Sequence, residues 1–200
     1  MALLSVRGLR TDLIGPIDLD VDRGDCVLVS GPSGSGKTLF LRAIADLDPN
    51  QGTVTLSERS RERYTGPAWR RDVTYVAAEP GWWTDRAGDH FDDPGTARTW
   101  LPRLGLGDDA LDKAVSVLST GERLRLAILR AAVQQPSVLL LDEPTAALDP
   151  AATGMVADLL RAALAEGLAL IVVSHQEDAV ARLARRRLAL RQGRFFEEAA

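Results

Sequence analysis

The feature that most constrains the fold is a glycine-rich segment between an apolar run and a helical pattern. Residues 31–38 read Gly-Pro-Ser-Gly-Ser-Gly-Lys-Thr and fit the pattern G-x-x-x-x-G-K-[ST]. The apolar run Cys26–Ser30 before it is typical of a buried strand, and residues 39–44 continue an amphipathic helix. Glycines let successive backbone N–H groups surround phosphate oxygens at a helix N-terminus. This order therefore predicts an α/β sheet that binds phosphate.

Two side chains of this segment suit a triphosphate. We expect the Lys37 ammonium to reach the β- and γ-phosphates and the Thr38 hydroxyl to bind Mg²⁺. A dinucleotide site is excluded because no third glycine follows Gly34 and Gly36 at the required spacing. The alternative is a glycine- and serine-rich turn that only caps a helix.

A second motif places two carboxylates at the end of a predicted strand. Val138–Asp142 has four apolar residues before its aspartate, and Glu143 follows. Because parallel strands end at one edge of a sheet, we expect Asp142 beside the phosphate-binding loop, holding the water shell of Mg²⁺. Glu143 would polarise the water that attacks the γ-phosphate. The alternative is a turn that the two carboxylates merely cap.

The rest of the chain alternates short β-branched runs with longer helical patterns, which is typical of a mainly parallel α/β sheet. Two hairpins are also expected, over residues 17–30 and 188–196. The expected strands are residues 3–6, 17–21, 26–30, 52–57, 73–77, 138–142 and 169–174, and the expected helices are residues 37–47, 120–134, 151–166 and 177–185.

Length and composition predict one soluble intracellular domain over residues 1–200. Hydrophobic residues make up 46% of the chain, enough for a sizeable core, but no apolar run approaches the length of a membrane span and no secretory signal is recognisable. The single cysteine excludes a disulfide framework, and the net charge of −4 argues against nucleic acid as a partner. Residues 79–118 break the alternation, so we expect a small inserted helical lobe with its own minor core.

Three further segments complete a pattern. Residues 118–122 read Leu-Ser-Thr-Gly-Glu, residues 146–149 read Ala-Ala-Leu-Asp, and residues 171–175 read Ile-Val-Val-Ser-His. Together with the phosphate-binding loop and the two carboxylates, they make the chain from about Leu3 to Gly193 resemble the nucleotide-binding domain of ABC-type ATPases. The three segments are similar to the family's LSGGQ signature, its D-loop and its switch strand.

The resemblance implies a P-loop NTPase fold with a mainly parallel sheet, an N-terminal antiparallel β portion and the inserted lobe. It implies that two copies pair head to tail, each ATP with its Mg²⁺ lying between one copy's phosphate-binding loop and the other's signature. It further implies ATP hydrolysis that drives a separate transmembrane permease from the cytoplasmic face of the membrane. The alternatives are a soluble non-transport ABC ATPase and a nucleotide-dependent regulator.

By the same resemblance, Lys37, Glu143 and His175 would be catalytic, and Thr38, Asp142 and Glu79 would bind the metal. Within one chain, the signature is alternatively a helix cap made by its serine. The residues expected to bind the nucleotide are Gly31, Pro32, Ser33, Gly34, Ser35, Gly36, Lys37, Thr38, Leu39, Ser119, Thr120, Gly121, Glu122 and Asp142.

The chain departs from the family pattern at two places. Residues 8–12 contain no aromatic side chain to stack on adenine, so the base would rest on Arg10 or on an aliphatic surface. Ala78 stands where the family has a glutamine that contacts Mg²⁺. Either Glu79 takes over this contact, or the contact is absent and turnover is slow.

Two tryptophans follow the second departure. Trp82 and Trp83 stand where the family forms a groove for a short cytoplasmic helix of the permease. They either anchor that partner or fill the core of the lobe.

Overall fold

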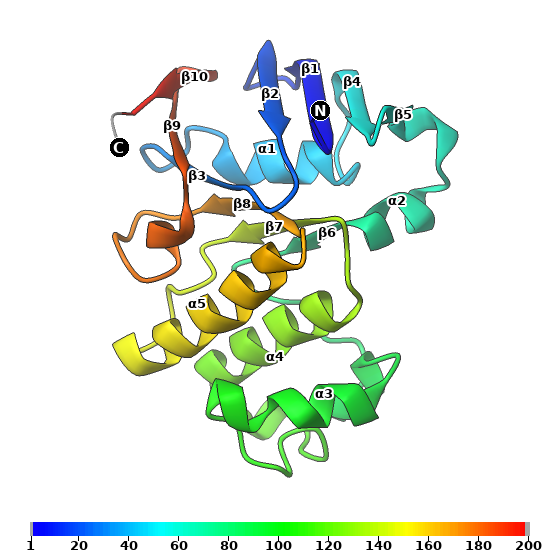
Figure 1. Ribbon diagram of the computed structural model, residues 1–200, viewed down its shortest axis with the longest axis vertical. Coiled ribbons are helices and arrows are strands. Elements are labelled where there is room, and N and C mark those ends of the chain that lie inside the picture. Colours follow the sequence, from blue (N-terminus) through cyan, green and yellow to red (C-terminus); the bar gives the residue numbers. More distant parts are fainter. Residues whose placement is uncertain (1, 199–200) are drawn as a thin grey trace.

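The computed structural model describes residues 2–198, whose strands form two sheets (Figure 1). The smaller sheet is antiparallel with the order β2-β1-β4-β5. The larger sheet has the order β10-β9-β3-β8-β7-β6, and only its β10–β9 pair is antiparallel. The strands are β1 (Leu4–Arg10), β2 (Ile17–Val21), β3 (Cys26–Ser30), β4 (Gln51–Leu56), β5 (Arg59–Ser60), β6 (Val73–Val76), β7 (Val138–Asp142), β8 (Ala169–Val173), β9 (Arg186–Arg191) and β10 (Arg194–Glu197).

Helices cover both faces of the larger sheet. Helix α1 packs between the two sheets, while α4 and α5 cover the opposite face of the larger one (Figure 1). The α-helices are α1 (Lys37–Ile44), α2 (Gly66–Asp72), α3 (Pro94–Trp100), α4 (Thr120–Val133) and α5 (Pro150–Ala165). The 3-10 helices are η1 (Arg61–Arg63), η2 (Ala87–His90), η3 (Pro102–Leu104), η4 (Val115–Val117) and η5 (Ala181–Leu183).

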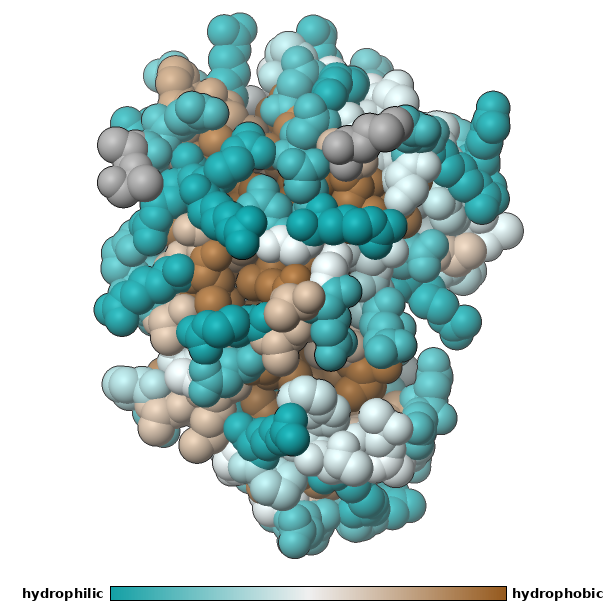
Figure 2. Space-filling model, viewed as in Figure 1, coloured by the Kyte–Doolittle hydropathy of each residue, from teal (hydrophilic) through white to brown (hydrophobic). Residues whose placement is uncertain are grey.

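This layering explains why the central strands are so apolar. Every residue of β7 and β8 is buried, because each strand has helices on both sides. Such strands read as continuous apolar runs rather than as alternating patterns. The predicted mainly parallel sheet with an N-terminal antiparallel portion is confirmed, and so is the C-terminal hairpin of β9 and β10. Figure 2 shows apolar residues in hollows between rows of hydrophilic side chains.

The predicted hairpin over residues 17–30 is wrong. Strand β2 pairs with β1 in the smaller sheet, whereas β3 lies between β8 and β9 in the larger one. The turn itself exists, since the Asp25 N–H donates to the Asp22 carbonyl at 3.2 Å. A turn between two apolar runs does not reveal that the chain changes sheets at that point.

The predicted helix over residues 177–185 is also wrong, because only the short 3-10 helix η5 forms there. Its backbone becomes extended at Ala184, and the Arg185 N–H donates to the Cys26 carbonyl at 3.0 Å. The pairing of β9 with β3 therefore draws the chain out of the helical conformation.

Residues 79–118 form a region that contains α3 and three 3-10 helices below α4 in Figure 1. The expected separate core is absent from it. Leu101, Leu104 and Leu111 are fully buried in the same cluster as Leu126 of α4 and Leu160 of α5. The region therefore shares the core of the main sheet's helical face. Within residues 2–198, no helix has the length and apolarity that crossing a membrane requires.

Candidate active site

The phosphate-binding loop between β3 and α1 takes a backbone conformation that requires glycine. Gly31 and Gly36 have φ values of 142° and 97°. A Cβ atom on Gly36 would lie 2.3 Å from the Ile14 side chain, and one on Gly31 would lie 2.4 Å from the Leu190 carbonyl oxygen. Gly36 is also the N-cap residue of α1 and makes no side-chain cap. The first N–H groups of α1 are therefore free to bind an anion.

Lys37 begins α1 and lies along the loop. Its ammonium donates to the Gly31 carbonyl at 2.8 Å and to the Pro32 carbonyl at 3.1 Å. Burial lowers the pKa of Lys37, and the nearby carboxylates of Glu143 and Asp142 oppose that shift. A charged, partly desolvated ammonium beside free N–H groups provides a strong site for phosphate.

Thr38 and Asp142 meet at the edge of the larger sheet. The Thr38 hydroxyl donates to Asp142 Oδ2 at 2.8 Å, and the Tyr75 hydroxyl donates to the same oxygen at 3.1 Å. Burial and the Asp142 carboxylate raise the pKa of Tyr75, so this phenol stays protonated as a donor. Sequence reasoning missed Tyr75, whose only signal was a polar group in a strand beside the one that carries Asp142.

The oxygens of Thr38 and Asp142 suit Mg²⁺. Two adjacent ligands of an octahedral magnesium ion lie about 2.9 Å apart, close to the separation observed here. Among the described residues 2–198, no group of three or more His, Cys, Asp or Glu side chains would hold a metal by itself. Mg²⁺ usually keeps several waters and binds one or two protein groups plus substrate phosphates, and the two oxygens of Thr38 and Asp142 fit that pattern.

Glu143 occupies a strained turn directly after β7. Its φ is 47°, and its N–H donates to the Val173 carbonyl at 2.8 Å. One carboxylate oxygen lies 3.5 Å from His175 Nε2, and the other accepts the His175 N–H at 3.4 Å. Burial raises the pKa of Glu143, while His175 and Lys37 lower it. A raised pKa makes this carboxylate a better proton acceptor, as a general base requires.

One cavity of about 490 Å³, a size suited to a nucleotide, is lined by Lys37, Thr38, Asp142, Glu143 and His175. Leu13, in the loop between β1 and β2, also lines it and is 73% exposed. Leu13 gives this lining an exposed aliphatic side chain, whereas Arg10 is not part of the lining. The predicted site residues in the lining are Ser33, Gly34, Gly36, Lys37, Thr38, Leu39, Asp142, Glu143 and His175.

The structure does not bring Glu79 or residues 119–122 to this cavity. Glu79 is exposed. Ser119 is the N-cap residue of α4, where its hydroxyl accepts the Glu122 N–H at 3.2 Å and the Glu122 carboxylate accepts the Ser119 N–H at 2.8 Å. Within one chain, this segment is a complete capping box.

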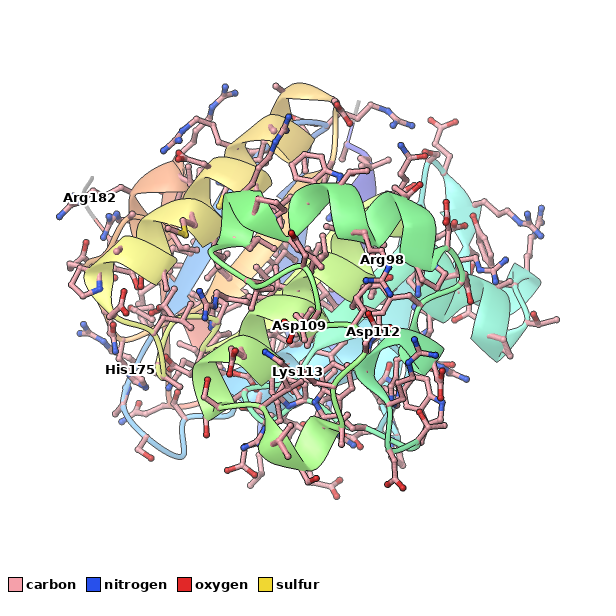
Figure 3. The ribbon with its side chains drawn as sticks, turned by 90° about the horizontal axis from the view of Figure 1, so that it is seen from below. Arg98, Asp109, Asp112, Lys113, His175 and Arg182 are labelled. Carbon is pink, nitrogen blue, oxygen red and sulfur yellow. The ribbon has the colours of Figure 1, made fainter. Side chains whose placement is uncertain are left out.

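A second group of charged side chains, within residues 79–118, does not line the cavity. Figure 3 shows Arg98 and Asp112 close to Lys113 and Asp109, with His175 at the edge of the molecule away from them. Arg98 pairs with Asp112 at 2.8 Å and Lys113 with Asp109 at 3.0 Å, all on exposed surface. Exposed pairs of this kind contribute little to stability, because solvent screens them.

Comparison with known proteins identifies the family. The family model described as ABC transporter matches residues 14–146, which is more than half of the chain. The chain is 32% identical over 210 residues to the glutamine transport ATP-binding protein GlnQ of Bacillus subtilis, a match covering 92% of this chain and 82% of the relative. The chain therefore belongs to the ABC transporter family.

Two further similarities extend over nearly the whole chain. The lipoprotein-releasing system ATP-binding protein LolD of Myxococcus xanthus is 36% identical over 227 residues, covering 98% of this chain and 100% of the relative. Among solved structures, a dimeric post-hydrolysis state of an ATP-binding cassette bound to ADP and Pi is similar with a TM-score of 0.84. That match has 26% identity and covers 98% of this chain and 97% of the other.

Proposed function

We propose that this chain is the ATP-binding and ATP-hydrolysing subunit of an ABC transporter and drives a separate transmembrane permease. The observation that carries the proposal is the cavity in which the phosphate-binding loop, the Thr38–Asp142 pair and the Glu143–His175 pair converge. The names of GlnQ and LolD, both ATP-binding proteins of transport or release systems, support it.

Each group then has a defined task. Lys37 and the N–H groups at the start of α1 bind the β- and γ-phosphates. Thr38 and Asp142 would hold Mg²⁺, which would supply positive charge to the phosphate oxygens. Glu143 accepts a proton from the attacking water, and His175, which lies beside Glu143, contacts the γ-phosphate. Leu13 supports the base through an aliphatic contact, so preference for adenine should be weak.

The signature requires a second copy of the chain. Ser119 caps α4 away from the cavity, while the N–H groups of Thr120 and Gly121 lie at the positive end of the helix. In a head-to-tail dimer, they would bind the γ-phosphate held by the partner. The dimeric state of the solved relative bound to ADP and Pi supports this arrangement.

The test is a Glu143→Gln variant in excess Mg-ATP. We expect phosphate release to fall at least about 100-fold, because general-base catalysis is lost while binding is retained. The variant should elute as a dimer with ATP and as a monomer without it. A monomer under both conditions would refute the head-to-tail dimer. Wild-type ATP binding without measurable phosphate release would favour a nucleotide-dependent regulator instead.

A groove of about 310 Å³ next to β6 is the proposed docking site for the permease at the cytoplasmic face of the membrane. Trp83 lines it and is 70% exposed, whereas Trp82 packs against the main core. The Arg130 guanidinium lies over both indole rings, 4.8 and 4.9 Å from their centres. Each of the two roles considered for these tryptophans therefore fits one of them: Trp82 fills core and Trp83 is available to a partner.

We expect Trp83→Ala to leave basal ATPase activity unchanged and to prevent co-purification of a membrane-spanning protein from detergent-solubilised native membranes. Phe196→Ala is the matched control, because Phe196 is an aromatic side chain that is 53% exposed in β10. Co-purification that survives Trp83→Ala would remove the docking site. The absence of any membrane-spanning partner of the wild-type chain would favour a soluble non-transport ABC ATPase.

A further inference from the structure

A partly buried hydrogen bond lies outside the lining of the candidate active site. Thr145 follows Glu143 by two residues and is 1% exposed. Its hydroxyl donates to Asp178 Oδ2 in the loop after β8, three residues beyond His175. Neither Thr145 nor Asp178 lines the nucleotide cavity. The bond therefore joins the segment that carries the general base to the segment that carries the histidine, outside the volume that the nucleotide would fill.

Asp178 is itself fixed to the backbone. Its other carboxylate oxygen accepts the N–H groups of Val180 and Ala181, each at 2.9 Å. Its carbonyl accepts the Arg182 N–H at 3.1 Å. These bonds anchor the carboxylate to the turn of η5, so Thr145 is tied to a well-supported point.

The turn after β7 needs such support. Glu143 has the left-handed φ of 47°, a backbone conformation that is strained for a residue with a side chain. Its direct contacts with His175, at 3.4 and 3.5 Å, are long and do not by themselves fix the two residues relative to each other. The hydrogen bond from the Thr145 hydroxyl to the Asp178 carboxylate is a further side-chain link between these two segments.

We propose that Thr145 and Asp178 are positioning residues, whose bond holds the Glu143 turn and the His175 loop in the geometry that hydrolysis requires. This inference rests on the proposed ATPase function and adds two residues that touch neither nucleotide nor metal. A displacement of about 1 Å at a reacting group costs on the order of 100-fold in rate. Loss of the hydrogen bond between Thr145 and Asp178 should therefore affect turnover far more than nucleotide binding.

The principal test is Thr145→Val, which removes the hydroxyl and keeps the volume of the side chain. We expect kcat for ATP hydrolysis to fall at least about tenfold, with KM and the calorimetric ATP affinity within about twofold of wild type. Thr145→Ser keeps the hydroxyl and should restore most of the turnover. Thr153→Val is the matched control, because Thr153 is a buried threonine of α5 outside the site.

A double-variant cycle tests whether the two residues act through one bond. Asp178→Asn keeps an oxygen for the Val180 and Ala181 N–H groups and replaces the oxygen that accepts from Thr145. The variant carrying both Thr145→Val and Asp178→Asn should turn over no more slowly than the slower single variant. If circular dichroism shows that Thr145→Val does not fold, kcat and KM are instead compared between Asp178→Asn and Thr145→Ser.

The possible outcomes separate this inference from the function on which it rests. Wild-type kcat in a folded Thr145→Val variant, or equal loss in Thr145→Ser and Thr145→Val, would overturn the positioning role and leave the ATPase function intact. A large rise in KM with unchanged kcat would also overturn it. A wild-type chain that does not bind ATP would instead refute the proposed function.

Discussion

Helix α1 begins after a glycine, whereas helix α4 begins after a serine, and the two N-termini differ in how their N–H groups are satisfied. Gly36 offers no side-chain cap to α1. Ser119 and Glu122 form a reciprocal capping box at α4 that occupies two N–H groups. One helix end is therefore open to a ligand in the single chain, while the other is stabilised before any partner arrives.

The difference shows what each end requires. The start of α1 lies beside Lys37 and the two carboxylates of β7 and its following turn, so a bound triphosphate with its metal would satisfy all of them together. The start of α4 does not line the cavity, so the lysine and carboxylates of the cavity are not its partners. The side chains proposed to bind phosphate therefore gather at the start of α1, whereas the start of α4 is capped within the chain.

The largest expected effect comes from a substitution at the uncapped N-terminus of α1. Lys37→Ala removes a charge-assisted contact worth about 1.5–3 kcal/mol, so ATP affinity should fall by about ten- to 100-fold or beyond detection in a calorimetric titration. Because burial lowers the pKa of Lys37 in the folded chain, losing this ammonium should not reduce the melting temperature without ATP.

Lys113→Ala is the matched control for that variant. Lys113 is the second lysine of the chain and pairs with Asp109 in the region below α4, away from the cavity. Its removal should leave ATP affinity unchanged. Wild-type affinity in Lys37→Ala would show that the loop between β3 and α1 does not hold the triphosphate.

A smaller effect is expected from a substitution at the capped N-terminus of α4. Hydrogen bonding to the Ser119 backbone N–H lowers the pKa of Glu122 in the folded chain. The capping box therefore contributes stability above the ordinary pKa of a glutamate, and this contribution is lost as pH falls through the lowered folded-state value. The difference in unfolding free energy between wild type and Glu122→Gln should be at most about 0.5 kcal/mol, since the pair is partly exposed and screened.

Urea unfolding of both proteins from neutral pH down to about pH 3 measures this difference. It should be constant at neutral pH and shrink in the acid range. A difference that does not change with pH would mean that the Glu122 carboxylate does not cap α4 in solution.

The sequence predicted those parts of the site that depend on local chemistry. The spacing of Gly36, Lys37 and Thr38 after an apolar run predicted a strand, a loop and a helix, and all three are present at those positions. The apolar run before Asp142 predicted a strand that ends at the loop, and the Thr38–Asp142 hydrogen bond confirms their proximity. Burial makes this apolar run easy to recognise, because both faces of β7 are covered and must be apolar.

Other contacts between distant segments lay beyond sequence reasoning. Nothing in the order of residues placed the Tyr75 hydroxyl on Asp142, or Leu13 at the mouth of the cavity. The link from Thr145 to Asp178 spans 33 residues and depends on β7 and β8 being neighbours. A polar side chain carries no sign of its partner until the sheet order is known.

The residue types and their spacing determined by themselves the strand, the glycine-rich loop and the helix that begins at Lys37, since these features depend on interactions over a few residues. Tertiary structure alone decided which sheet β2 and β3 join, that the region containing α3 shares the main core, and which groups surround Glu143. Those outcomes depend on burial and on pairing between remote strands, and the free energy of such contacts is not written in any local stretch of the chain.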